Sequence, residues 1–381
     1  MTEYSQDVPI DDWRTGLTRL SLDIIAGNIP DIFNISGLPV EQYVAMGLLE
    51  DLYPFIDNDP ELSREDFIEY ILRSAEIDGG LYYVFPIFTL PTIIGNPIVL
   101  GSKTDWNLDE FLAVLDENPE ADVPLGARWT NEIFFTHAIL RNINYFFNRD
   151  TGEVDFDNED FIKLLEVANR FPSVAPEFGE YDERDDIATG RQIMAYSSNY
   201  DFSQYQMYRE FFGGELVFKG SPTVDRRGNM IWAFPSFAIS SVSENKDGAW
   251  SFIRSLMTES SLRNTITESP HGIPSNKAVL DWMIENAMNE PEGTVSIGAD
   301  FGGGFSIIEV AASPLSEAEK NLFLERIYAA MPERGDDSEL FSLTDIILET
   351  ASDYFAGRIT AEDAARIIQS RASIFAAEQF G

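Results

Sequence analysis

The alternation of apolar and polar positions divides this chain into helices and short buried strands. Apolar residues recur at helical spacing over 13–25, and the apolar helical segment stops at Gly27. After a turn that contains a helix-breaking proline, the apolar run 32–35 predicts a short buried strand. A second helix is predicted from 40 to Gly47. This order of helix, strand and helix predicts one step of an open α/β sheet.

The same patterns predict further elements along the chain. Helices are expected over 66–77, 128–140, 160–171, 249–257 and 361–378, and strands over 81–88, 193–196 and 237–240. A polar, hairpin-like turn is expected over 146–156, between apolar ends. One more helix is expected to begin after Asn107, because Glu110 at the third helical position completes a capping box.

Binding groups are expected where the strands end. Ligands of open α/β sheets bind at the carboxyl ends of the strands. Asn34 and Ser36 stand at the end of the first strand, and Tyr200 and Asp201 follow the strand 193–196. The pattern therefore places amide, hydroxyl, phenol and carboxylate groups where a ligand would lie.

The length and composition narrow the class of protein. The chain has 381 residues, 44% of them apolar and 13% aromatic, which is typical of a globular protein that folds as two domains. There are 26 lysines and arginines against 65 aspartates and glutamates, and the net charge is −39. That charge repels phosphate backbones and anionic lipids, so we expect no nucleic-acid partner. It fits simple solubility, a neutral or cationic ligand, or a salty exterior, and these alternatives stay open.

Cysteine usage and the apolar runs exclude several further features. The chain contains no cysteine, and therefore no disulfide, thiolate metal site or cysteine nucleophile. No uninterrupted apolar run reaches the ~18 residues that a membrane span needs. Residues 1–7 are acidic and polar and do not have the pattern of a signal peptide.

Catalytic and metal sites find little support in the sequence. The two histidines, His137 and His271, lack metal-ligand spacing, and we interpret His137 as a helix residue with a satisfied ring and His271 as a loop residue. The glycines 302–304 are not followed by the lysine and hydroxyl residue of a phosphate-binding loop. Carboxylates are so abundant that no pair stands out as the acid and base of a glycosidase. We therefore predict no enzyme, no cofactor and no metal.

Three blocks of sequence resemble one known family. They are AGNIPDIF, YVAMGLLEDLYPFID and DGGLYYVFPI, in this order and at ordinary spacing. With them the chain resembles the extracellular solute-binding proteins of family 1. These are the sugar-capturing subunits of ABC importers and are related to maltose-binding protein.

The resemblance implies an α/β fold of the two-lobed, type II periplasmic-binding-protein kind, in which the chain crosses between lobes at a hinge. Residues 1–88 and 223–312 would form lobe one, and residues 89–222 and 313–381 would form lobe two. Family members open with a strand, a helix and a second strand ahead of the point where this chain begins. We therefore expect lobe one to be N-terminally incomplete in this chain.

The expected binding groups are polar side chains and aromatic rings, because sugars present rims of hydroxyls and apolar ring faces. The resemblance places an acid and an aromatic against the sugar at Glu132 and Phe134. Trp232 has two interpretations, a cleft residue or a core tryptophan. The candidate ligand-binding residues are Asn34, Ser36, Trp129, Asn131, Glu132, Phe134, Tyr200, Asp201 and Trp232. The tryptophans expected to be structural are Trp13, Trp106, Trp250 and Trp282.

By this resemblance we predict a non-catalytic, extracytoplasmic solute-binding protein. It would act as a monomer, on the cell surface as a lipoprotein or in the periplasm, and would deliver a small polar ligand, a carbohydrate, to the permease of an ABC importer. The alternative is a ligand-sensing or interaction module of a larger surface protein with the same fold, and permease genes nearby would separate the two. A carbohydrate-active enzyme is a third interpretation, which a turnover assay on sugars would test.

Overall fold

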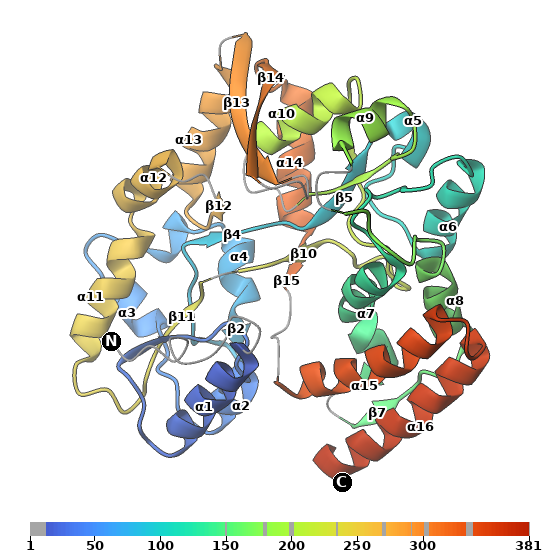
Figure 1. The fold of residues 1–381 in the computed structure, drawn as a ribbon. Coiled ribbons are helices and arrows are strands. Elements are labelled where there is room, and N and C mark those ends of the chain that lie inside the picture. The colour runs from blue at the N-terminus through green and yellow to red at the C-terminus, as the bar shows by residue number, and fades with distance from the viewer. Residues whose placement is uncertain are drawn as a thin grey trace. The chain divides into compact units, whose positions relative to one another are not determined.

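The chain folds into two compact units of helices and short strands (Figure 1). The computed structural model describes residues 13–148, 151–177, 181–197, 202–233, 235–268, 272–290, 292–300, 305–332 and 338–380. Unit 1 takes the described residues of Met1–Thr89, Ile231–Asn289 and Ala330–Phe341, and unit 2 takes those of Leu90–Met230, Glu290–Ala329 and Ser342–Gly381. The chain therefore crosses between the units five times.

Unit 1 combines helices with short paired strands (Figure 1). Its helical elements are α1 (Trp13–Ile25), α2 (Val40–Ala45), α3 (Tyr53–Asn58), the 3-10 turn η2 (Arg64–Asp66), α4 (Glu69–Ser74), α11 (Lys246–Met257), α12 (Glu259–Glu268) and α13 (Lys277–Met288). Its strands are β1 (Ile32–Asn34), β2 (Glu76–Ile77), β3 (Gly80–Leu81), β4 (Ile87–Phe88), β11 (Phe237–Ile239), β12 (Ile273–Pro274) and β15 (Met331–Pro332). Strand β10 (Met230–Ile231) contains a crossing and pairs with β15.

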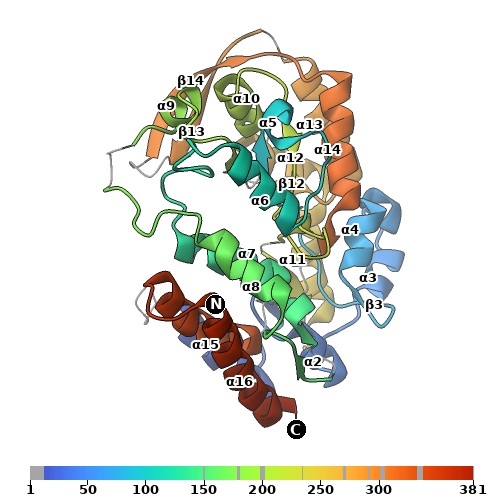
Figure 2. The ribbon, with the colours of Figure 1, turned by 90° about the vertical axis from the view of Figure 1, so that its right-hand side faces the viewer.

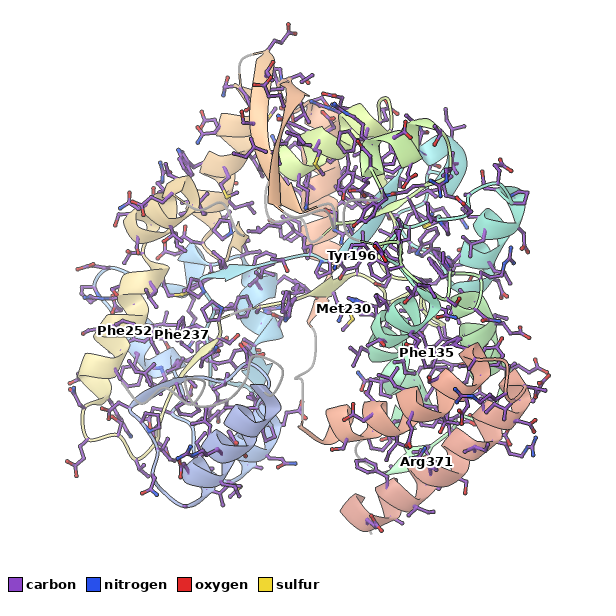
Figure 3. All side chains as sticks on the ribbon, viewed as in Figure 1. Phe135, Tyr196, Met230, Phe237, Phe252 and Arg371 are labelled. Carbon is purple, nitrogen blue, oxygen red and sulfur yellow. The ribbon has the colours of Figure 1, made fainter. Side chains whose placement is uncertain are left out.

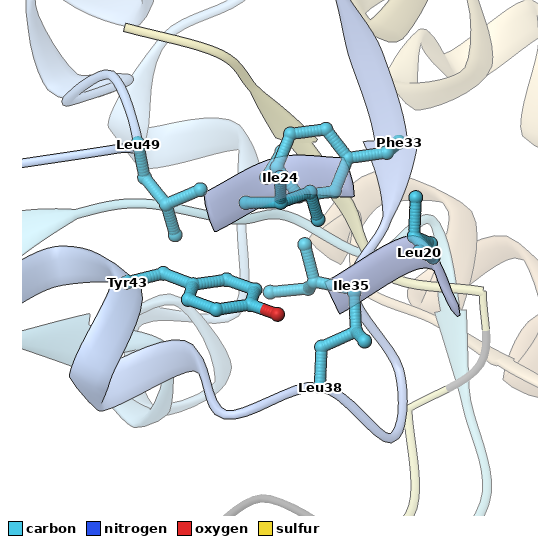
Figure 4. Close-up of a cluster of buried hydrophobic side chains, with 8 residues drawn as sticks. Leu20, Ile24, Phe33, Ile35, Leu38, Tyr43 and Leu49 are labelled. Carbon is cyan, nitrogen blue, oxygen red and sulfur yellow. The ribbon is translucent and has the colours of Figure 1, made fainter. Parts of the chain in front are cut away.

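An apolar cluster holds α1, α2 and β1 together (Figure 4). Leu20 and Ile24 are four positions apart in α1, so both point to the same side of the helix. They meet the side chains of the β1 segment and of α2, and Ala238 from β11 closes the cluster. The buried members are Leu20, Ile24, Phe33, Ile35, Leu38, Tyr43, Leu49 and Ala238. The phenol of Tyr43 is satisfied by the Ser21 hydroxyl at 2.7 Å, so the cluster contains a tyrosine without an unpaired polar group.

The segment around β11 lies between two other segments of unit 1. On one side it pairs antiparallel with β1, with Asn34 opposite Phe237. On the other side Phe237 bridges Val84, and Trp232 bridges Thr89 in the same antiparallel register. The end of β1, the segment that leads to the first crossing and the segment that follows the second crossing are therefore neighbours in one unit.

Unit 2 contains the longer helices and the longest strands (Figures 1 and 2). Its helices are α5 (Pro97–Leu100), α6 (Leu108–Glu117), α7 (Asn131–Phe146), α8 (Glu159–Ala168), α9 (Glu183–Ala188), α10 (Phe202–Phe211), α14 (Glu317–Ala329), α15 (Ser338–Phe355), whose first turn precedes the last crossing, and α16 (Ala361–Phe380). Its strands are β5 (Thr92–Gly95), β6 (Phe147–Asn148), β7 (Glu153–Val154), β8 (Ala195–Ser197), β9 (Val217–Phe218), β13 (Gly293–Asp300) and β14 (Phe305–Ala312). Helices α15 and α16 lie side by side in both views.

A small antiparallel sheet in the order β8-β5-β9 is the centre of unit 2. Every residue of β5 is buried, because the strand is covered on both faces. In its register Ile93 stands opposite Tyr196, and Ile94 stands opposite Phe218. The sheet therefore places Tyr196 opposite the fourth residue of unit 2 after the first crossing.

The boundaries of the units differ from those expected for the lobes in three places. The second crossing follows Met230 rather than residue 222, because the loop before it is bonded to unit 2: Asn142 donates to the Pro222 carbonyl and accepts from the Val224 amide. Residues 290–312 belong to unit 2, because β13 and β14 pack on α10. Residues 330–341 belong to unit 1, because β15 pairs with β10 and contacts α4.

The element predictions were right where a local signal is complete. Asn107 and Glu110 form the expected capping box at the start of α6, and the turn over 146–156 is the hairpin of β6 and β7. The expected helix 66–77 was wrong, since the structure has only the short α4 there, and the expected strand 81–88 is interrupted between β3 and β4. Over the residues described here, no helix is both long enough and apolar enough to cross a membrane.

Candidate functional site

Three rings of unit 2 lie against one another near the start of α7. Trp129 precedes α7, His137 lies on it, and Tyr196 lies on β8, where Figure 3 labels it. The ring centroids are 4.9 Å apart for Trp129 and His137, 5.1 Å for Trp129 and Tyr196, and 5.5 Å for His137 and Tyr196. Trp129 and Tyr196 are half-buried and His137 is exposed, so part of this group faces solvent. We call Trp129, His137 and Tyr196 the aromatic cluster of unit 2.

The turn that positions Trp129 depends on a glycine. Gly126 has φ = +108°, and a Cβ atom there would lie 3.3 Å from Oε1 of Gln192. The Gly126 carbonyl accepts from the Trp129 amide at 3.0 Å, and the hydroxyl of Thr130 then caps α7 by accepting from the Ile133 amide. A side chain at 126 would disturb the turn and, through it, the place of the Trp129 ring.

His137 is uncharged at neutral pH. Loss of hydration among the surrounding protein atoms, and then the positive charge of Arg141, lower the pKa of His137 to about 4. More than a third of the residue's surface nevertheless remains open to solvent. The aromatic cluster of unit 2 therefore presents neutral rings, with a histidine that can both donate and accept a hydrogen bond.

The polar residues at the start of α7 have different surroundings. Asn131 is buried, and its side-chain oxygen accepts from the Glu132 amide at 2.8 Å, so it shapes the helix start. Glu132 is exposed, and its carboxylate accepts from the Ser352 hydroxyl at 3.0 Å. Glu132 keeps acceptor capacity for a ligand, because a carboxylate offers about four acceptor positions.

Phe134 does not fit the binding role that the resemblance implied. Its side chain is 2% exposed and stacks on Phe171 at 4.2 Å and on Phe111 at 5.4 Å. A ring that is buried and packed against two other rings has no surface for a ligand. The helical period explains the difference, since residue 134 faces the core while 133 and 137 face outward. Phe134 is therefore a core residue of unit 2.

In unit 1 the side chain of Asn34, at the end of β1, accepts hydrogen bonds from three donors. Its Oδ1 atom accepts from the Ser36 amide (3.1 Å), the Ser36 hydroxyl (2.9 Å) and the Ser236 amide (3.0 Å). The Asn34 side-chain oxygen therefore bonds only within the folded chain. The side-chain amide nitrogen of Asn34 makes no hydrogen bond to the described residues. Asn34 and Ser36 are both half-buried. The strand end therefore offers an amide donor held at a fixed position.

Trp232 is a surface tryptophan. Its side chain is 45% exposed, although its backbone is bonded to Thr89 in both directions. The core interpretation is therefore wrong, and the indole is exposed on the segment that follows the second crossing. Tyr83 precedes Val84, the residue that bridges Phe237. Loss of hydration, and then the negative charge of Glu41, raise the pKa of Tyr83 to about 12.

The remaining tryptophans are structural where the structure describes them. Trp106 and Trp250 are buried, and their indole nitrogens donate to the Gly220 carbonyl and to Asp59. Trp282 stacks under the guanidinium of Arg263. The side chain of Trp13 lies outside the described residues, as do Tyr200 and Asp201.

Sequence reasoning missed two residues of the aromatic cluster. His137 was interpreted as a satisfied helix residue, and Tyr196 as part of a buried strand. The spacing of Ile133 and His137, four apart on the outward side of α7, could have indicated that His137 faces away from the core. No local signal brings Tyr196 to Trp129, because the two lie on different elements.

The described residues hold no metal-binding group of three or more histidine, aspartate or glutamate side chains. A separate open groove of about 740 Å³ lies on unit 2, between the β6–β7 hairpin, the end of α7 and α16. Tyr145 and Asn148 line it, and none of the predicted site residues does. The groove is therefore distinct from the aromatic cluster of unit 2.

The sequence matches one protein family. The family described as bacterial extracellular solute-binding protein matches over residues 6–261, about two thirds of the chain.

Several solved structures share the fold. The sugar-binding protein MalE from Xanthomonas citri has a TM-score of 0.63 at 12% identity, covering 98% of this chain and 91% of that chain. An ABC transporter solute-binding protein from Thermotoga lettingae, bound with α-D-tagatose, has a TM-score of 0.55 at 14% identity, covering 94% and 88%. A substrate-binding protein from Listeria monocytogenes, in complex with cycloalternan, has a TM-score of 0.57 at 15% identity, covering 96% and 89%. The likeness shows the α/β fold of type II periplasmic binding proteins.

Proposed function

This chain belongs to the family of bacterial extracellular solute-binding proteins, and we propose that it captures a carbohydrate for an ABC importer. The family match carries the binding function. The aromatic cluster of unit 2 supports the carbohydrate class, because partly exposed neutral rings suit the apolar faces of sugar rings. The ligands bound in two of the similar solved structures, α-D-tagatose and cycloalternan, belong to the same class.

Each unit supplies groups of the kind that a sugar needs. In unit 2, Trp129 and Tyr196 offer ring faces, and Glu132, three residues after Trp129, offers acceptor oxygens. In unit 1, Trp232 offers an exposed indole, and Asn34 offers an amide donor. Hydroxyls that are left unpaired on binding cost about 1–3 kcal/mol each, so such groups would select the ligand. Phe134 is not part of the proposed site, because it is enclosed in the core.

The proposed role is non-catalytic, and the proposed partner is the permease of an importer. We place the protein outside the cytoplasmic membrane, as the family is extracellular, and propose that it acts as a monomer on the cell surface or in the periplasm. A turnover assay on the sugar that binds would test the absence of catalysis. Analytical ultracentrifugation would test the monomeric state.

Calorimetric titration of the purified chain against a sugar panel tests the proposal. The panel contains maltose, D-tagatose, acarbose and cycloalternan, and we expect saturable heat from at least one. The same sugar should raise the melting temperature, because a ligand that binds only the folded state stabilises it. Glycerol at equal concentration is the control for non-specific stabilisation. Folded protein that gives neither heat nor a melting shift with every sugar would contradict the carbohydrate assignment.

A further inference from the structure

Arg326 is a buried cation that is held by neutral acceptors. It lies on α14 and is 4% exposed. Its Nη2 atom donates to the carbonyls of Leu90 (2.9 Å) and Pro91 (3.1 Å), and Nη1 donates to the Thr92 hydroxyl (2.5 Å). No carboxylate among the described residues pairs with it. A charge without a counter-ion is costly to bury, so packing alone does not account for an arginine here.

The lowered pKa of Arg326 is consistent with a cation that is buried among neutral acceptors. Burial lowers the pKa of Arg326 to about 9, and the nearby phenol of Tyr196 acts in the opposite direction. The guanidinium also lies 5.0 Å from the ring centre of Phe218 on β9, so it faces one more strand of the sheet. The Nε atom has no hydrogen-bond partner. The fork of the side chain, not its stem, therefore makes the polar contacts.

The acceptors of Arg326 all belong to one crossing segment. Residues 90–92 are the first of unit 2 after the first crossing, and α14 ends where the chain crosses again, between 329 and 330. Thr92 is fully buried, and its hydroxyl oxygen accepts a second hydrogen bond from the Gly220 amide at 3.0 Å. Gly220 opens the loop that leads to the second crossing, and its carbonyl is in turn held by Trp106.

We infer that Arg326 is a positioning residue of the hinge, which fastens the unit 2 ends of three crossing segments to one another through Leu90, Pro91 and Thr92. The planar fork suits this task, since one guanidinium bonds three acceptors in fixed directions, which a lysine ammonium does not. Loss of the fork would leave each segment free to move on its own. The consequence for ligand capture rests on the proposed function, whereas the fastening itself does not.

The absence of cysteine allows a direct test without a ligand. Spin labels on Ser251→Cys of α11 in unit 1 and Ala113→Cys of α6 in unit 2 occupy exposed helical positions. Double electron–electron resonance then gives the distribution of distances between the units. We expect Arg326→Met to broaden this distribution relative to the labelled parent. A distribution as narrow as that of the parent would overturn the inference.

The matched control is Arg371→Met. Arg371 also bonds a threonine hydroxyl, that of Thr350 at 2.9 Å, together with Glu349, but it joins α16 to α15 away from the first crossing (Figure 3). Arg371→Met should leave the distribution unchanged. Equal broadening by both variants would mean a general loss of rigidity and would also overturn the inference.

A second pair of variants covers the case in which Arg326→Met does not fold. Thr92→Val removes the hydroxyl that accepts from Arg326 and from the Gly220 amide and that donates to the Ile93 carbonyl, and it should broaden the distribution. Thr92→Ser keeps the hydroxyl and should not. Titration of the labelled proteins with D-tagatose and maltose separates this inference from the proposed function. Broadening without any sugar response would support the fastening and contradict carbohydrate capture. A sugar response together with distance distributions as narrow as that of the parent would support carbohydrate capture and contradict the fastening.

Discussion

At the scale of single residues, exposure separates the aromatic side chains that can meet a ligand from those that hold the core. Trp232 and the aromatic cluster of unit 2 keep open ring surface, whereas Phe134 and Trp106 do not. All of them are aromatic side chains, and the sequence alone does not separate them. Their roles differ because stacking on a sugar needs a free ring face, and the core leaves none.

Removing the Trp129 ring should weaken sugar binding with little effect on folding. We expect Trp129→Ala to reduce the affinity for the sugar found in the panel by about tenfold or more, equal to ~1.4 kcal/mol, measured by calorimetry. Trp282→Ala is the matched control, because Trp282 is also a half-buried tryptophan but stacks with Arg263 in unit 1. Equal losses in both variants would contradict a specific role for Trp129.

His137 should stay neutral over the ordinary pH range. Its pKa of about 4 in the folded protein lies below the ordinary value of 6.5, so the unfolded chain binds the proton more readily. The contribution of His137 to stability is therefore complete above pH ~6.5 and is lost as the pH falls through ~4. Proton NMR of the two imidazoles, assigned with His137→Gln, measures this midpoint. A midpoint near 6.5 would show that the surroundings do not lower the pKa of His137.

At the scale of elements, α7 divides its residues between two tasks. One side carries Phe134 and Phe135 into the core, and the other carries Glu132 and His137 toward solvent. The helical period enforces this division, because neighbours in sequence point about 100° apart. One helix can therefore stabilise unit 2 and supply binding groups without a conflict between the two.

Truncation of the Phe134 side chain should lower the stability of the folded protein and leave its sugar affinity unchanged. We expect Phe134→Ala to lower the free energy of unfolding by ~3–5 kcal/mol, because it opens a cavity beside Phe111 and Phe171. Denaturant titration measures this, with Ile133→Ala as the exposed neighbour, for which ~0.5 kcal/mol or less is expected. Folded Phe134→Leu that lost sugar affinity tenfold would restore the ligand role implied by the resemblance.

The β1 strand end depends on one acceptor atom. Asn34→Ala would leave the Ser36 amide, the Ser36 hydroxyl and the Ser236 amide without their common partner. We expect the free energy of unfolding to fall by ~1–3 kcal/mol. Asn34→Asp keeps an oxygen at the same place and should recover most of the loss in the same denaturant titration. Equal stability of the alanine variant and the parent would mean that water replaces the asparagine oxygen.

At the scale of the whole molecule, the net charge of −39 is the dominant electrostatic feature. Salt bridges such as Arg191–Asp122 and Arg64–Asp57 are exposed and offset little of the repulsion. The excess negative charge keeps the chain soluble but opposes the compact state, because like charges are closer together when it folds.

Salt should therefore stabilise the folded chain. We expect the melting temperature to rise between 0.01 M and 0.3 M sodium chloride, since the screening length falls from ~30 Å to below ~10 Å. Sorbitol at equal osmolality is the control for excluded solute. A melting temperature that falls with salt would mean that attraction within the ion pairs outweighs the repulsion.

The sequence by itself determined the class of fold and the local structure wherever the signal is contained in a few neighbouring residues. The capping box at Asn107 and Glu110, the helix stop at Gly47 and the hairpin before residue 156 depend on contacts within a turn or two. The family blocks are likewise continuous in sequence, and the family followed from them. Such features need no knowledge of distant partners.

Only the tertiary structure decided which of the candidate residues can act. Phe134 lies in the core because Phe171 covers it from another element, and Trp232 is exposed because the β10–β11 segment leaves its side chain open. Tyr196 meets Trp129, and Arg326 meets Thr92, across separations of tens to hundreds of residues. The sequence pattern records which residues are apolar and at what period, but burial depends on what the rest of the chain places against them.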